Sequence, residues 1–145
     1  MTTHLGAQTM RSRNMASRRW WRWPVAIVVA AHGAIHLLGV WWTFDLGEID
    51  ELGGPTLLGT GQAPGEPAMI VLGFLWLIAA LGFIAAGVAV AIGLSQAAQL
   101  IRLAAGISLI PTVIWWNDAW IGAVLSAVLL VVATRERLTP QGGPR

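Results

Sequence analysis

The chain has 145 residues, of which 56% are hydrophobic and only 11% are charged, whereas soluble domains carry about 25% charged residues. All nine basic residues are arginine, the formal net charge is only +2, and cysteine is absent, which excludes disulfides, thiolate metal centres and thioether-linked haem. So small an excess of positive charge indicates no nucleic-acid partner, and the composition predicts an integral membrane protein whose first partner is the lipid bilayer.

The chain begins with a polar, arginine-rich segment, residues 1–23, which we expect to be disordered and cytoplasmic. The first apolar run, residues 24–42, is flanked by tryptophans, as is typical of a helix that crosses a membrane. An acidic connection, residues 43–67, follows this helix. Its prolines and glycines predict a loop on the outer side of the membrane, where it offers a surface for a partner.

Three further apolar runs follow the acidic loop, at residues 68–93, 100–116 and 119–133. The last two are shorter than the roughly 20 residues that a spanning helix needs, but tryptophans mark their common end and arginines mark the other. Only Asn117 and Asp118 separate them, which predicts a tight hairpin between antiparallel helices.

These elements predict an all-α fold, an integral membrane bundle of four transmembrane helices over residues 24–134, with a cytoplasmic tail at 135–145. With four spans, the N-terminal segment, the connection around Arg102 and the tail lie on one side, and together they contain all nine arginines. Six of the seven acidic residues lie on the other side, and only Glu136 shares the arginine side. Because positive loops stay inside, we expect both termini in the cytoplasm of a bacterial plasma membrane.

His32 and His36 are the candidate site residues in the first span. Four residues apart, they share one helix face and lie about 6 Å apart along the axis. Ionisable side chains within a span are functional hypotheses by default. A metal site would use both histidines with Asp118 as a third ligand, whereas haem b would take one histidine per iron or bind at a dimer interface.

Two further hypotheses concern the same histidines. They could line a quinone or lipid-headgroup site, or they could have a structural role. In the structural role, which is favoured, neutral imidazoles form hydrogen bonds with polar residues of neighbouring helices and fix the packing. The polar candidates are Ser108, Thr112, Asn117, Ser126 and Asp118. The sequence leaves the metal, haem, quinone or lipid-headgroup and structural hypotheses open, and it identifies no cofactor.

Small residues indicate how the helices approach one another. Gly82 with Ala86, and Gly122 with Ser126, form small-xxx-small pairs that allow close backbone contact in lipid. These pairs pack together either the helices of one copy of the chain or two copies of it. Pro111 predicts a kink in the third helix, with the neighbouring threonine bonding the freed carbonyl.

Two motifs resemble those of a known group of proteins. Residues 32–39 read HGxIHLxG, and residues 116–122, at the turn between the third and fourth helices, read WxDAxxG. Together they resemble a group of small bacterial four-helix membrane proteins that have no established activity. The group's turn has Lys and Phe after the Ala and Asn four residues beyond the Gly, whereas this chain has Trp120, Ile121 and Ser126. The resemblance implies the four-helix architecture and points to His32, His36 and Asp118.

The sequence lacks the parts of a catalytic site, with no cysteine, lysine or tyrosine and no paired carboxylates or nucleophile motif. We interpret Asp118 as a helix cap within an aromatic belt. The prediction is therefore a non-enzymatic accessory or scaffold subunit, as a homo-oligomer or in a larger membrane complex. The alternative is a metal-, haem- or quinone-binding membrane protein that uses His32 and His36.

Overall fold

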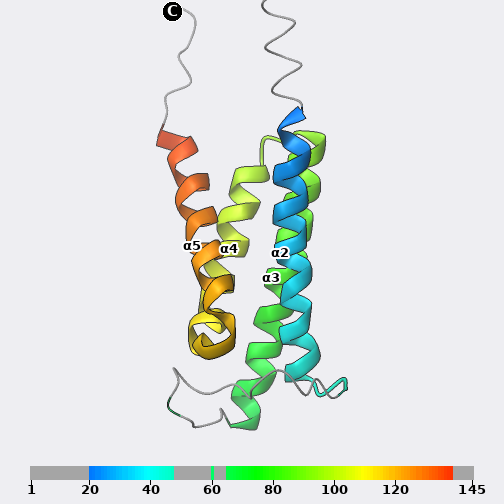
Figure 1. Ribbon diagram of the computed structural model, residues 1–145, viewed down its shortest axis with the longest axis vertical. Helices are drawn as coiled ribbons and strands as arrows, with labels where there is room; N and C mark the ends of the chain where they lie inside the picture. Colours follow the sequence, from blue (N-terminus) through cyan, green and yellow to red (C-terminus); the bar gives the residue numbers. More distant parts are fainter. Residues whose placement is uncertain (1–19, 48–59, 61–64, 139–145) are drawn as a thin grey trace, which may run out of the picture.

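The computed structural model describes residues 20–47, 60 and 65–138, and these residues form four helices without any strand (Figure 1). The helices are α2 (Arg22–Thr43), α3 (Glu66–Ile92), α4 (Ala97–Ile114) and α5 (Trp116–Leu138). Each contains a stretch that is long and apolar enough to cross a membrane. The predicted all-α architecture with four candidate spans is therefore confirmed. Most of the predicted N-terminal segment, outer loop and tail lies outside the described residues.

The four helices run up and down in sequence order. Figure 1 shows that α2 begins, and α5 ends, at the same end of the bundle, which we call the termini end. The opposite end, where α2 finishes, is the loop end. Extensive packing joins α2 to α3, α3 to α4 and α4 to α5, whereas α2 and α5 are not among the extensively packed pairs. One side of the bundle, between α2 and α5, is therefore only loosely closed.

Helix α3 ends at a glycine because its last turn needs a left-handed residue. Gly93 has φ 77° and ψ 36°, a conformation that costs a residue with a Cβ atom more than it costs glycine. The chain turns there, and the backbone N–H of Leu94 donates to the carbonyl of Ala89 at 2.8 Å. Only four residues then separate α3 from α4, so the two helices lie side by side.

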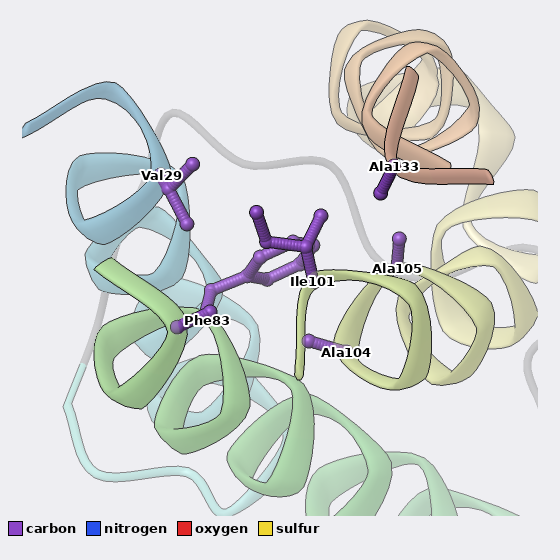
Figure 2. Close-up of a cluster of buried hydrophobic side chains, with 7 residues drawn as sticks. Val29, Phe83, Ile101, Ala104, Ala105 and Ala133 are labelled. Carbon is purple, nitrogen blue, oxygen red and sulfur yellow. The ribbon is translucent and has the colours of Figure 1, made fainter. Parts of the chain in front are cut away.

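The apolar core draws on all four helices. Figure 2 shows Val29 of α2, Phe83 of α3, Ile101 of α4 and Ala133 of α5 converging on one cluster. The other three buried members of this cluster are alanines, so the helices approach closely here rather than interlock through large side chains. Large apolar side chains instead cover much of the exterior of the bundle, as expected for a protein surrounded by lipid.

Glycines allow the closest helix contacts. A Cβ atom on Gly33 of α2 would lie 2.8 Å from both the carbonyl oxygen of Ala80 and the Cβ of Phe83, so α2 and α3 touch backbone to backbone. On the other face of α3, a Cβ on Gly82 would lie 3.0 Å from the Cβ of Ala104 in α4. Gly82 therefore lies at a contact within one copy of the chain.

The predicted hairpin between the last two helices was placed wrongly. α4 ends at Ile114 and α5 begins at Trp116, so Asn117 and Asp118 lie in the first turn of α5 and do not form the connection. Trp115 alone separates the helices. Its indole N–H donates to the Asp118 carboxylate at 2.9 Å, which ties the connection to the start of α5.

The expected role of Thr112 was also wrong. Helix α4 continues through Pro111, which cannot donate to the carbonyl of Ile107 four residues earlier. The Thr112 hydroxyl donates instead to the carbonyl of Ser108, its own partner one turn back, at 2.8 Å. A threonine hydroxyl on a helix most easily reaches the carbonyl four residues before it. This local geometry explains why Thr112 bonds Ser108 and not the carbonyl freed by Pro111.

Candidate functional site

The two histidines of α2 lie in the interior of the bundle. His32 is 3% exposed and His36 is 1% exposed, and their rings meet edge to face with centroids 4.6 Å apart. One turn of helix separates them, so the same face of α2 carries both toward α4 and α5. The shared face predicted from the i, i+4 spacing therefore points inward.

Both histidines bond serines on other helices. His36 Nε2 lies 2.6 Å from the Ser108 hydroxyl on α4, and His32 Nε2 lies 2.9 Å from the Ser126 hydroxyl on α5. The two hydroxyls are themselves 2.8 Å apart, and both serines are fully buried. These four side chains form one continuous hydrogen-bonded cluster, which we call the His–Ser network. Ser108 and Ser126 are two of the polar candidates identified from the sequence.

The directions of the bonds in the network follow from one contact. His36 Nδ1 lies 2.8 Å from the carbonyl oxygen of His32, which can only accept, so Nδ1 carries the proton. With both imidazoles uncharged, His36 Nε2 then accepts from the Ser108 hydroxyl. Ser108 accepts from Ser126, and Ser126 accepts from the N–H at His32 Nε2. The Nδ1 atom of His32 is left as an unprotonated acceptor, with no donor supplied by the described part of the chain.

The His–Ser network joins α2 to two helices, α4 and α5, with which it otherwise packs little. It connects α2 to α4 and α5, and the bond between His32 and Ser126 links α2 directly to α5. Hydrogen bonds between helices in membranes average about 0.6 kcal/mol and reach about 1.7 kcal/mol. Because α2 and α5 share few other contacts, this bond fixes their spacing.

A cavity of about 340 Å³ lies beside the network, in the loop-end half of the bundle. Both histidines form part of its wall, and α2 and α5 supply most of the remaining lining. Ile35 and Ile121 also line it, yet they are 60% and 63% exposed, so they form a rim on the outside of the bundle. The cavity therefore opens toward the apolar surroundings of the helices.

A second cavity, of about 270 Å³, lies in the termini-end half and is again lined by residues of α2 and α5, among them Val25 and Val132. The loosely closed side between α2 and α5 therefore contains one cavity on the loop-end side of the bond between His32 and Ser126, and one on its termini-end side. Arg22 lies at this second cavity.

Aromatic rings surround the inner wall of the first cavity. Trp76 of α3 meets the His36 ring edge to face at 5.0 Å and the Trp115 ring at 6.0 Å. Gly39 of α2 leaves room for this indole, since a Cβ there would lie 2.7 Å from the Cε2 atom of Trp76. Any larger residue at position 39 would therefore displace the Trp76 indole at the contact between α2 and α3.

Trp76 has an unusual polar atom. Its side chain is 5% exposed, and its indole Nε1 is, among the described residues, the single side-chain nitrogen or oxygen that is fully inaccessible and has no hydrogen-bond partner. A buried donor without an acceptor costs about 1–3 kcal/mol. Trp76 also lines the cavity, but its Nε1 atom is itself inaccessible and lies on the packed side of the ring.

Asp118 is placed at the edge of the cavity and not in the network. It is exposed, it lines the cavity at the start of α5, and its carboxylate accepts from the Trp115 indole. The structure does not gather it with His32 and His36 into a metal-ligand set, since no group of three His, Asp or Glu side chains within the described ranges is placed to hold an ion. Three of the four imidazole nitrogens bond protein groups instead.

Sequence reasoning missed Trp76 and the cavity itself. The only available signal was a single tryptophan inside the second apolar run, several residues from either end, whereas tryptophans usually gather at the ends of a span. The sequence did identify Gly122 and Ser126 as small residues of one face. In the structure Ser126 belongs to the network, and Gly122 lines the cavity with a Cβ position 3.9 Å from the His32 ring.

In comparisons with known proteins, no family model, no curated protein and no solved structure matches this chain. The resemblance to small bacterial four-helix membrane proteins therefore stays a prediction.

Proposed function

We propose that this chain is an integral protein of a bacterial plasma membrane with both termini in the cytoplasm. Four helices able to span a membrane support the first part, and the arginine distribution supports the orientation. The bacterial origin rests on the resemblance carried by the HGxIHLxG and WxDAxxG motifs.

Reporter fusions test the orientation. Green fluorescent protein fused after Arg145 should be fluorescent, whereas alkaline phosphatase at the same place should be inactive, because it folds only after export. The same pair inserted in the acidic loop, after Gly54, should give the opposite result. An active phosphatase after Arg145 would show that the orientation is inverted.

Within that membrane protein, the proposed function is the binding of a small lipophilic molecule in the cavity between α2 and α5. The observation that carries it is the cavity of about 340 Å³ with an exposed apolar rim, a volume within the range of small-molecule sites. A rim of isoleucines favours access from the acyl-chain region of the bilayer. This corresponds to the quinone-binding form of the alternative derived from the sequence.

The accessory or scaffold function stays a prediction beside this proposal. The small residues that motivated it lie at contacts within one copy. Gly82 faces Ala104, Ala86 is fully buried, and Gly122 and Ser126 belong to the cavity and the network. Lipophilic binding is favoured because Gly122 lines the cavity, whereas the contacts of Gly82 within one copy leave it no role in joining two copies.

A cavity-filling variant tests the proposal. The Cβ position of Gly122 lies at ordinary contact distance from Thr112 and His32, so Gly122→Leu should place its side chain in the cavity. Protein in lipid nanodiscs is titrated with a tritiated, decyl-substituted benzoquinone. We expect saturable binding by the wild type and at least a tenfold weaker affinity in Gly122→Leu.

The matched control is Gly106→Leu on α4. A Cβ at Gly106 has no atom within 4 Å, so this variant adds the same side chain at an exposed position outside the cavity. It should bind the probe as the wild type does. Absence of saturable binding by the wild type, or equal binding by Gly122→Leu, would contradict the proposed function.

A further inference from the structure

We propose that the occupant of the first cavity carries a hydroxyl group that donates a hydrogen bond to the Nδ1 atom of His32. This inference rests on the proposed function and deepens it, because it names the chemical class of the ligand as a lipophilic hydroxyl compound, such as an alkylated phenol or quinol. The starting observation is that His32 lines the cavity, and that the described residues supply no donor to its Nδ1.

The hydrogen bonds of the His–Ser network leave this nitrogen without a proton. His36 Nδ1 donates to a backbone carbonyl, and this fixes the direction of every later bond, up to the N–H of His32 Nε2 that donates to Ser126. An uncharged imidazole carries one ring proton, and in His32 that proton is on Nε2. Nδ1 is therefore an acceptor, and the ligand group that suits it is a donor.

The Nδ1 atom of His32 is accessible from the cavity. Among the described residues, Trp76 Nε1 is the single side-chain nitrogen or oxygen that is both fully inaccessible and without a partner. Because His32 Nδ1 also lacks a partner, it must keep accessible surface, and His32 lines the first cavity but not the second. The adjacent ring atom, Cε1, lies 3.9 Å from the Cβ position of Gly122 in the same wall. A ligand in the cavity can therefore reach the unused acceptor.

A hydroxyl that binds at His32 breaks no hydrogen bond of the protein. The side chain is only 3% exposed, so its free acceptor is largely withheld from water, and a donor on the ligand satisfies it. A bond accepted at Nδ1 also polarises the ring and strengthens the bond that Nε2 donates to Ser126. An occupant without a donor leaves Nδ1 unsatisfied and binds more weakly.

The other polar side chains of the cavity wall suit the hydroxyl less well than His32 does. Thr112 donates its hydroxyl to its own preceding turn, and its methyl carbon is the atom that lies near the Cβ position of Gly122. His36 uses both ring nitrogens within the network. Asp118 is exposed at the edge of the cavity and already accepts from an indole. An exposed carboxylate gains little when a ligand hydroxyl replaces water.

The experiment compares two probes that differ in whether their oxygen can donate a hydrogen bond. Tritiated para-decylphenol and its methyl ether are titrated against the whole protein in lipid nanodiscs, with each concentration expressed as a mole fraction of the lipid. We expect the wild type to bind the phenol about three- to tenfold more tightly than the ether, which is the range that one net hydrogen bond provides. His32→Phe keeps an aromatic ring in the wall but removes Nδ1, so it should abolish this preference.

Asp118→Ala is the matched control, since it removes the exposed acceptor at the edge of the same cavity. It should leave the ratio of the two affinities as in the wild type. Equal affinity of the wild type for both probes overturns the inference even if His32→Phe fails to fold. An unchanged ratio in a folded His32→Phe, or loss of the preference in Asp118→Ala, also overturns it. These results leave the proposed function intact, whereas no saturable binding of the quinone or of either new probe by the wild type removes the proposed function itself.

Discussion

Replacing Gly33 by alanine should lower the free energy of unfolding by about 2–3 kcal/mol, because the new methyl group overfills a tight contact. Its Cβ would lie 2.8 Å from the Ala80 carbonyl oxygen and 2.8 Å from the Cβ of Phe83. Neither atom belongs to the flexible end of a side chain, so α2 and α3 must move apart. Reversible unfolding of the protein in mixed micelles, followed by circular dichroism, measures the change.

Gly106→Ala is the control for this substitution. Gly106 lies within α4 and has open space around its Cβ position, so alanine there gains only helix propensity, about 0.5–1 kcal/mol in favour of the folded state. The two variants therefore make the same chemical change with opposite expected signs. If Gly33→Ala proved as stable as the wild type, the close contact between α2 and α3 would be wrong.

Replacing Ser108 by alanine should have the second-largest effect, a loss of about 1–2 kcal/mol in the free energy of unfolding. Ser108 is the centre of the His–Ser network, since it donates to His36 and accepts from Ser126. Alanine leaves both partners buried and short of one bond each, and buried polar groups without partners are costly. The same unfolding measurement tests this, with the exposed Ser95→Ala as a control expected to change stability by less than about 0.5 kcal/mol.

A double-mutant cycle separates the network from its single members. His36→Phe removes the ring nitrogen that accepts a hydrogen bond from the Ser108 hydroxyl. Ser108→Ala should therefore lower the free energy of unfolding by less in that background than in the wild type. We expect the two changes together to destabilise by at least 0.5 kcal/mol less than their sum, on the scale typical of coupled pairs. Strict additivity would mean that the short contact between His36 and Ser108 contributes no coupling.

The network and the cavity are parts of one arrangement. His32 and His36 belong to both, and the bond between His32 and Ser126 crosses the loosely packed side where the cavity opens. A hydrogen-bonded cluster that fixes the spacing of α2 and α5 also fixes the width of the cavity between them. Variants of the network should therefore weaken probe binding together with stability, whereas Gly122→Leu should weaken binding alone.

Length and composition by themselves determined that this protein is an all-α bundle with four helices able to span a membrane. Such helices must satisfy their backbone internally, so a run of apolar residues of sufficient length fixes both the element and its environment. The i, i+4 spacing likewise determined that His32 and His36 share a face. These properties are local, and a single sequence is enough to read them.

Only the tertiary structure decided what that face contacts. The choice of Ser108 and Ser126 among several polar candidates, the position of the turn at Trp115, and the unpaired indole of Trp76 depend on how helices far apart in the sequence come together. Small residues permit many close packings, and hydropathy does not distinguish them. The cavity between α2 and α5 is likewise visible only in the tertiary structure, because it arises where two helices do not pack fully against each other.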